Sequence, residues 1–278
     1  MEDVFKSNRE FILSKRENLS VLTGCLYSDI ATRYRHTYRS TPSPYEIAGI
    51  YRDLLSLHSE VCVSPDFALF CKAFSDVFGS IYTAPRDTEK DNSPPKIAYL
   101  QNTFSDRAYM NFSSRFERVS AVYYPGFSEI CEEVYNGGCT YAMLPVYNSS
   151  NGQLVSFRRL ILKYDLKISL VTDIETPDES SMRFALLQKG IDSTMMKNRS
   201  CLDLFMVLDS CDYAPFLSAC HELGAEVLMM NSLPLEYSDD RQGLSLQLDI
   251  ANSDRNALLC FLEASHIRYD IAGFYDVV

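Results

Sequence analysis

Three short stretches of the sequence carry side chains that can bind a negatively charged organic molecule. Thr103 and Ser105 supply hydroxyl groups, Asn148 and Ser149 supply an amide and a hydroxyl, and Arg183 supplies a guanidinium. The stretches fall at the predicted ends of strands and starts of helices, where backbone N–H groups favour carboxylates. A fold that brings them together would hold a dianionic ligand.

Each of these residue types also has a purely structural use. Thr103 and Ser105 can cap the helix that follows them, and Asn148 and Ser149 can be plain turn residues. Arg183, on a predicted strand, can pair with a structural carboxylate. The sequence leaves both uses open at every one of these positions.

The size and charge of the chain limit the class of protein. At 278 residues it is long enough for two or three compact domains, and 46% apolar residues exclude a disordered polymer. The net charge of −11 argues against nucleic acid and anionic membranes as partners, because phosphate binding needs a basic surface. We therefore expect a globular multidomain protein with neither partner.

The cysteines and histidines do not have the spacing of a metal site. The nine cysteines are odd in number and form no CxxC pair, so we expect buried, reduced thiols. The four histidines are scattered, and neither a metal nor a cofactor is expected. The first residues, MEDVFKSNRE, lack a signal core, and no apolar run approaches the roughly 20 residues of a membrane span. We expect a cytoplasmic protein.

Residues 1–83 have the pattern of an all-α domain with a long, a medium and a short helix. The breaks fall at Ser40–Pro44 and just before Pro65, where a serine can cap the next helix. Residues 84–95, APRDTEKDNSPP, are charged and rich in proline, which is typical of a linker. The third helix carries an aromatic stripe that we predict to be core: Phe67, Phe70, Phe74 and Phe78.

Residues 96–190 alternate short apolar strands with helices, which indicates βαβ units on a mainly parallel sheet, and so a single α/β lobe. The expected strands are 97–100, 120–124, 141–146, 167–173 and 183–187. Three helices are expected: one that begins at residue 105, one over 127–135 and one over 153–162. Residues 191–278 follow the order βαββαβ, with strands 202–208, 226–230, 244–250 and 268–274 and helices 214–223 and 254–265. That order is ferredoxin-like. The fold class expected for the whole chain is α+β multidomain.

Three segments resemble the motifs of prephenate dehydratases, in the same order. They are KIAYLQNTFSDRAYMNF (Lys96–Phe112), YAMLPVYNSSNGQL (Tyr141–Leu154) and SMRFALL (Ser181–Leu187). With the helical domain before them and the ferredoxin-like module after them, the chain resembles the chorismate mutase–prephenate dehydratase (P-protein) family with its C-terminal ACT domain. The resemblance implies L-phenylalanine biosynthesis, from chorismate to prephenate to phenylpyruvate, and a lobe of the periplasmic-binding-protein-like type.

This chain departs from that family at positions important for dehydration. The family's proton-donating threonine is replaced by Met182, whose thioether cannot donate a proton, and its loop glutamate is replaced by Tyr147. Where the family inserts a second lobe that closes the substrate cleft, this chain has about ten residues, 174–182. We therefore predict that dehydratase activity is impaired or lost. The dehydratase-like substrate-binding residues that remain are Thr103, Ser105, Asn148, Ser149 and Arg183.

The helical domain is similar to the helical chorismate mutases, whose basic side chains hold a dicarboxylate in a compact conformer. The resemblance places Arg9 and Arg35 at two of those catalytic basic positions, although both can instead lie on a solvated helix face. It also places Glu46-Ile47 where the family has an Arg-Glu pair. An acidic side chain therefore stands where the substrate carboxylate needs a positively charged one. Other arginines of the same stretch can substitute: Arg33, Arg39 and Arg52.

In the ACT-like module, Asn231, Ser232 and Pro234 resemble one of the family's two phenylalanine-binding segments. The other segment falls on Cys211-Asp212-Tyr213, which lacks the glycine that lets a ligand approach the backbone. The resemblance implies chorismate, prephenate or phenylalanine as small-molecule ligands, and a homodimer through the helical and ACT modules.

Two functions remain open from the sequence. The chain is either a divergent enzyme with mutase (isomerase) or dehydratase (lyase) activity, or a pseudoenzyme. A pseudoenzyme would sense an aromatic amino acid or regulate an active pathway enzyme. The order of the three modules favours the first function. The replaced catalytic positions and the missing lobe favour the second.

Overall fold

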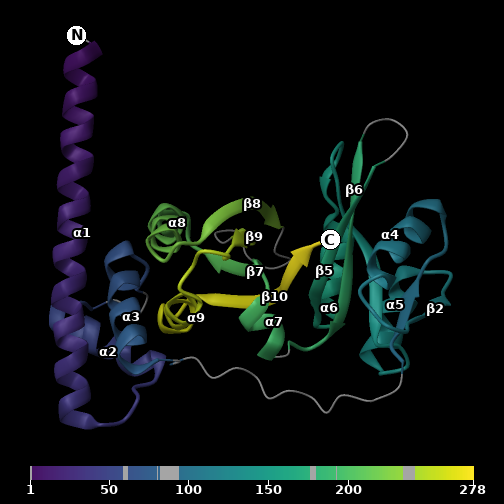
Figure 1. Cartoon of the computed structure of the whole chain (residues 1–278), viewed down its shortest axis with the longest axis horizontal. Coiled ribbons are helices and arrows are strands. Elements are labelled where there is room, and N and C mark those ends of the chain that lie inside the picture. Colours follow the sequence, from purple (N-terminus) through teal and green to yellow (C-terminus); the bar gives the residue numbers. More distant parts are fainter. Residues whose placement is uncertain are drawn as a thin grey trace. The chain divides into compact units, whose positions relative to one another are not determined.

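The structure is a computed structural model that describes residues 2–58, 62–79, 81, 94–175, 180–191, 193–233 and 242–278 (Figure 1). The chain divides into two compact units, which we describe separately. The helical unit holds residues 1–83, 209–226 and 252–267, and the sheet unit holds residues 84–208, 227–251 and 268–278. The division into domains 1–83, 96–190 and 191–278 stays a prediction, and most of the predicted linker, residues 84–93, lies outside the described residues.

In the helical unit, α3 (Pro65–Phe78) is the central element. It lies against α1 (Glu2–Tyr38), α8 (Tyr213–Glu222) and α9 (Arg255–Ala264), while α2 (Pro44–Leu55) contacts α9. A short 3-10 turn, η1 (Ser210–Asp212), leads into α8. None of the described helices combines the length and the apolar run that crossing a bilayer requires. Three of the four stripe residues are fully buried, and Phe78 is half-buried.

Serine caps fix the first residues of α2 and α3, as the sequence predicts. Ser43 Oγ accepts a hydrogen bond from the Glu46 backbone N–H (3.3 Å), and Glu46 Oε2 accepts one from the Ser43 backbone N–H (2.7 Å). This pair is a complete capping box. Ser64 Oγ accepts from the Phe67 N–H at 3.1 Å. Glu46 therefore has a structural use as the capping residue of α2.

Replacing Ser43 with alanine should lower the free energy of unfolding by about 0.5–2 kcal/mol, because the Glu46 N–H loses its acceptor. Hydrogen bonds from the Ser43 backbone and hydroxyl hold the pKa of Glu46 below its usual range. The contribution of the carboxylate is therefore complete above the ordinary glutamate pKa and is lost as pH falls through the lowered one.

Urea unfolding at pH 7 measures the total stability that Ser43→Ala removes. Urea unfolding at the lowest pH at which the protein remains folded measures the loss without the Glu46 carboxylate. The loss caused by Ser43→Ala should be smaller at the acidic pH. Ser14→Ala, at an exposed position of α1, is the matched control and should cost nothing. An equal loss at both pH values contradicts the role of the Glu46 carboxylate.

The sheet unit contains one continuous sheet, in the order β2-β1-β3-β6-β5-β10-β7-β9-β8, with β4 paired to β3 beside this path. Pairs β1–β2 and β1–β3 are parallel, whereas β3–β6 and β5–β6 are antiparallel. The expectation of a mainly parallel sheet is therefore wrong. The segment between β5 and β6 is too short for the crossover that a parallel pair needs. The strands of the predicted lobe are β1 (Lys96–Tyr99), β2 (Ser120–Tyr123), β3 (Tyr141–Asn148), β4 (Gly152–Gln153), β5 (Leu166–Glu175) and β6 (Ser181–Lys189).

Helices cover both faces of this part of the sheet. α4 (Thr103–Ser113) packs on β5 and β6, whereas α5 (Phe127–Tyr135) and α6 (Val155–Lys163) pack together on β3. Alternate residues of β1 point to opposite faces, as strand geometry requires. Ile97 and Tyr99 belong to the core cluster that includes Phe112 of α4, and Ala98 belongs to the cluster that includes Ile130 of α5.

The remaining strands are β7 (Cys201–Leu208), β8 (Glu226–Leu233), β9 (Gln242–Asp249) and β10 (Arg268–Val277), and the short helix α7 (Ser193–Asn198) precedes β7. Their order, β10-β7-β9-β8, is the one predicted for a ferredoxin-like sheet. Identification as an ACT domain stays a prediction. The sequence did not predict that β10 also pairs in parallel with β5, which joins the two parts into one sheet.

Gly273 is the residue at which β10 crosses closest to β5. A Cβ atom at this position would lie 2.3 Å from the carbonyl oxygen of Ile168 and 2.6 Å from its nitrogen. The same glycine faces Asp203 of β7 on its other side. Only a residue without a side chain allows this approach of two backbones.

Seven of the nine cysteines are buried, as predicted from the sequence, and two are not. Cys25 and Cys211 are exposed, and the other seven are buried; all nine are free thiols. Burial raises the pKa of Cys131 to about 12 and that of Cys220 to about 12. These two thiols are therefore unreactive core residues.

Candidate functional site

The dehydratase-like motif residues of β3 and β6 come together where these two strands pair. Arg183 lies opposite Tyr147 in the ladder, and Met182 lies opposite Asn148. Beyond them, the Ser149 N–H donates to the Ser181 carbonyl (2.9 Å), and Ser149 Oγ accepts from the Ser181 N–H (2.8 Å). Ser149 thus closes the end of the ladder.

The Arg183 guanidinium forms a bidentate ion pair within the protein. Its Nε and one terminal nitrogen donate to the two carboxylate oxygens of Asp173, each at 2.8 Å. The guanidinium also lies 6.0 Å from the centre of the Tyr147 ring. The hydrogen bonds that Arg183 donates to Asp173 outweigh burial and raise the pKa of Arg183. Arg183 therefore pairs with a structural carboxylate, which is one of the two uses that the sequence allowed.

Almost no space remains beside these residues. The cavity lined by Tyr147, Arg183, Gln153 and Tyr275 has a volume of about 10 Å³. One water molecule needs roughly 10–15 Å³. The cavity therefore admits one water molecule at most, and no organic substrate.

A buried ion pair that the sequence motifs do not include lines the same cavity. Arg158 of α6 pairs with Asp203 of β7, and both side chains are almost completely buried. Arg158 also donates to Ser245 Oγ, and the Gln247 amide donates to the second Asp203 oxygen (3.3 Å). Burial raises the pKa of Asp203, and Arg158 and Gln247 offset only part of this effect.

The sequence contained a signal for this pair. Asp203 interrupts the otherwise apolar strand Leu202–Leu208, and Arg158 lies one helical turn before Ile161 on the buried side of α6. Charged residues at apolar positions are rare unless they have partners. Neither position belongs to a family motif, so the family resemblance does not point to either residue.

Thr103 and Ser105 lie at the start of α4, which follows β1 in the chain. The cap of this helix is Asn102, whose side-chain oxygen accepts from the N–H groups of Phe104 (3.0 Å) and Ser105 (2.9 Å). The suggestion that Thr103 or Ser105 is the cap is therefore wrong. Thr103 is exposed and Ser105 is buried.

Asn148 takes a local role in the turn after β3. Its side-chain oxygen accepts a hydrogen bond from the Ser150 N–H at 2.8 Å, and the residue is half-buried. This geometry is an Asx-type turn, which satisfies a backbone donor without a ligand. Asn148 and Ser149 thus take the positions of turn residues.

The structure describes the side chain of one of the two predicted mutase-like residues, Arg35. Arg35 donates to the Val77 carbonyl at the end of α3 (2.5 Å), and its guanidinium lies 6.0 Å from the centre of the Phe78 ring. The Arg9 side chain lies outside the described residues. Arg35 therefore stabilises the contact between α1 and α3, which accounts for its position without a substrate.

The predicted effector segment lies on β8. Asn231 has a buried side-chain nitrogen without a hydrogen-bond partner, and Ser232 is exposed. Pro234 lies outside the described residues. A buried amide without a partner is costly, so Asn231 is a candidate to bind a ligand or a water molecule.

Residues 97–189 match the family model described as prephenate dehydratase. This chain contains a prephenate dehydratase-like domain. The match covers the motif residues of α4, β3 and β6, and about a third of the chain. No curated protein matches the sequence.

Solved structures share the fold of about two thirds of the chain. Prephenate dehydratase from Streptococcus mutans is 19% identical with a TM-score of 0.55, over 66% of this chain and 98% of that chain. A quorum-quenching acylase, GqqA, is 17% identical with a TM-score of 0.53, over 65% and 94%. Prephenate dehydratase from Arthrobacter aurescens in complex with L-Phe is 12% identical with a TM-score of 0.51, over 65% and 90%. At these identities the likeness concerns the fold alone.

Proposed function

We propose that this protein is a chorismate mutase–prephenate dehydratase-like protein of L-phenylalanine biosynthesis that no longer dehydrates prephenate. The observation that carries the proposal is the occupation of Arg183. Its Nε and one terminal nitrogen are held by Asp173, beside a cavity of about 10 Å³. Asp173 takes the bidentate Nε edge of the guanidinium, and the cavity is too small to bring a substrate carboxylate to the remaining N–H groups.

The chemistry of the neighbouring residue supports the same conclusion. The family resemblance puts the proton donor at Met182, and a thioether has no proton to donate to a leaving hydroxyl. Removing a general acid costs about 10²–10⁴ in rate. The closed cavity adds a steric barrier, so exchanging Met182 alone for threonine should not restore turnover.

A non-catalytic regulatory role is the second candidate, and Asn231 favours it. In this role the protein would bind an aromatic amino acid such as phenylalanine and act on an active pathway enzyme. The buried, unpaired amide of Asn231 lies on the strand that resembles a phenylalanine-binding segment. A ligand carboxylate would satisfy this donor.

A homodimer fits either role. Along α1, Leu19, Leu22 and Leu26 are spaced by one helical turn and are each more than half exposed. On β8, Leu228 and Met230 are exposed as well. Apolar side chains gathered on one helix face or one strand favour contact with a second copy of the chain.

Assays of the purified full chain test the proposal. With prephenate, phenylpyruvate formation should be at least about 100-fold slower than with an active prephenate dehydratase, as expected for a site without its general acid. Met182→Thr should leave the rate unchanged. Turnover comparable to that of the active enzyme contradicts the proposal.

A second pair of measurements separates the two roles. If the protein converts chorismate and the Arg35→Ala variant does not, the result supports a remaining mutase activity. No conversion, together with phenylalanine binding that Asn231→Leu removes in calorimetry, supports the regulatory role.

A further inference from the structure

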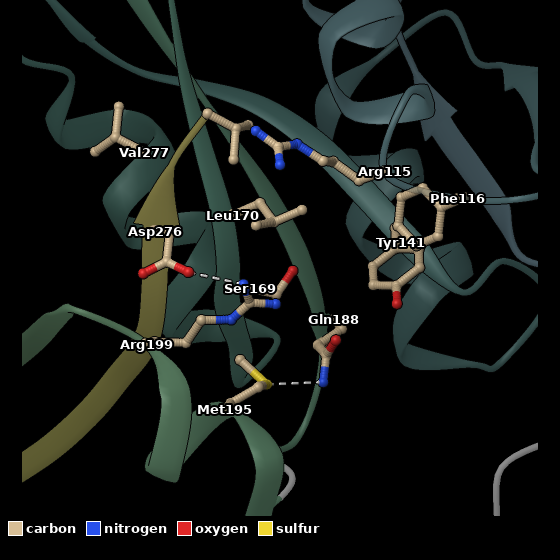
Figure 2. Close-up of a pocket in the computed structure, with 11 residues that line it drawn as sticks. Arg115, Phe116, Tyr141, Ser169, Leu170, Gln188, Met195, Arg199, Asp276 and Val277 are labelled. Carbon is tan, nitrogen blue, oxygen red and sulfur yellow. Dashed lines mark hydrogen bonds and ion pairs between the residues drawn. The ribbon is translucent and has the colours of Figure 1, made fainter.

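A larger cavity lies at the other end of the dehydratase-like domain from Arg183. Its volume is about 560 Å³, within the range of roughly 300–1,000 Å³ for small-molecule sites. Tyr141 lines it from the start of β3, and Gln188 lines it from the end of β6. Arg183 pairs with Tyr147 near the opposite end of these two strands. Figure 2 shows β5 crossing its floor, with Ser169 and Leu170 facing the space.

Two arginines reach into this space from different elements. Figure 2 shows Arg115, just after α4, and Arg199, just after α7, on different sides of Leu170. Arg199 is neutralised, because one terminal nitrogen donates to Asp276 at 2.9 Å. No side-chain hydrogen bond or ion pair joins Arg115 to any other described residue, and its side chain is exposed. Arg115 therefore provides a guanidinium that a ligand carboxylate can reach.

Asp276 cannot neutralise Arg115, because its oxygens are already occupied. One oxygen accepts from Arg199, and the other accepts from the Ser200 N–H and hydroxyl, each at 2.8 Å. Partial burial raises the pKa of Asp276, but these hydrogen bonds lower it by more, so that the carboxylate stays ionised. The neighbouring Val278 carbonyl accepts from Thr172 Oγ1 at 2.7 Å.

The wall opposite Arg199 is aromatic. Phe116 and Tyr141 face each other with ring centres 5.4 Å apart and an interplanar angle of 49°. Figure 2 shows both rings beside the cavity, and Leu170 lies between them and β10. A flat ring of a ligand could pack against these side chains in an offset or edge-on geometry.

One further polar group has weak partners that a ligand can replace. The Gln188 amide nitrogen donates to Met195 sulfur at 3.2 Å and to the Gly190 carbonyl at 3.4 Å. Sulfur is a weak acceptor, and 3.4 Å exceeds the usual length of an N–H···O bond. A better acceptor on a ligand would therefore draw this amide into the cavity.

We propose that this cavity binds a small aromatic carboxylate, with its carboxylate on Arg115 and its ring against Phe116 and Tyr141. Arg115 supplies the positive charge for one carboxylate, and the volume accepts a single ring with a short side chain. The site is separate from the Arg183 end of the domain. It does not depend on the proposed function.

Methionine methyl NMR with benzoate as the probe tests both binding and place. Met195 lines the cavity, whereas Met182 lies beside Arg183 at the far end of β6. Titration of the full chain should shift the Met195 methyl signal, assigned through Met195→Leu, and leave the Met182 signal unchanged. We expect a dissociation constant on the order of 0.1–1 mM for so small a ligand.

Charge and ring are tested separately by changing the ligand and the protein. Benzamide, without the charge, and cyclohexanecarboxylate, without the aromatic ring, should each bind at least about tenfold more weakly than benzoate. Arg115→Met should weaken benzoate binding at least about tenfold. Arg118→Met, an exposed arginine of the same segment that does not line the cavity, should leave it unchanged.

Three outcomes would overturn the proposal. The first is the absence of a Met195 shift at 10 mM benzoate, an upper concentration on the order of tenfold above the expected dissociation constant. The second is an equal loss of affinity in Arg115→Met and Arg118→Met, which would indicate general ionic attraction. The third is a shift of Met182 in place of Met195. Circular dichroism of each variant confirms folding, and because Arg115 is exposed its replacement should not unfold the chain.

Discussion

Replacing Arg158 with methionine should lower the free energy of unfolding by about 3–5 kcal/mol at neutral pH, because it leaves the Asp203 carboxylate buried without its partner. The Asp203 side chain is fully buried, and the remaining donor is the Gln247 amide at 3.3 Å. Urea unfolding measures the loss. Arg159→Met, at the exposed neighbouring position of α6, should change stability by less than about 0.5 kcal/mol.

The pH dependence of this variant tests the cause. Burial already raises the pKa of Asp203, and loss of Arg158 raises it further. A carboxyl with a raised folded-state pKa loses stability as pH rises above its unfolded value of about 3.9. The penalty in Arg158→Met should therefore grow as pH rises from about 4 to about 7, above that unfolded value.

A double variant separates charge from packing. Arg158→Met combined with Asp203→Asn should recover about 1–3 kcal/mol relative to the sum of the single variants, since it removes both charges. If the two losses simply add, the ion pair is not the source of the effect.

Replacing Gly273 with alanine should lower the free energy of unfolding by about 3 kcal/mol, at the upper end of overpacking effects. The added Cβ would fall 2.3 Å from the Ile168 carbonyl oxygen, and backbone atoms cannot rotate away as a flexible side chain can. Loss of the β5–β10 pairing should appear in hydrogen exchange as faster exchange of amides in Leu170 and Val171, which pair with Asp276 and Val277.

Gly49→Ala is the matched control for Gly273→Ala. Gly49 lies within α2, and a Cβ there would meet nothing within 4 Å. Alanine in a helix interior is about 0.5–1 kcal/mol better than glycine, so this variant should be more stable than the parent. Stabilisation by both substitutions would contradict the close approach at Gly273.

Local parts of the fold could be predicted from the sequence. Caps at Ser43 and Ser64, and the glycine that follows α5, mark helix ends through chemistry that involves only neighbouring residues. The short helix α7 was missed, because six residues are too few to show a helical period. The pairing of β5 with β10 was missed as well, since it joins residues about a hundred positions apart and no local pattern encodes it.

That the motif residues form a substrate site stays a prediction. The antiparallel pairing of β3 with β6 places the end of β3 beside the start of β6, so that Tyr147 lies opposite Arg183 and Asn148 lies opposite Met182. The occupation of Arg183 by Asp173 depends on the register of β5 against β6, which places these residues opposite each other. Register is fixed by the folded sheet, and the sequence motifs alone do not carry it.

The position of β10 sets an order on folding. This strand, residues 268–277, is the last one along the chain, yet it lies between β5 and β7. While the chain is being synthesised, β5 and β7 each keep an open edge until this ten-residue strand has left the ribosome. Open edges are templates for pairing with other chains. The nascent protein therefore depends on slow, long-range strand insertion, and it is exposed to aggregation until β10 has emerged.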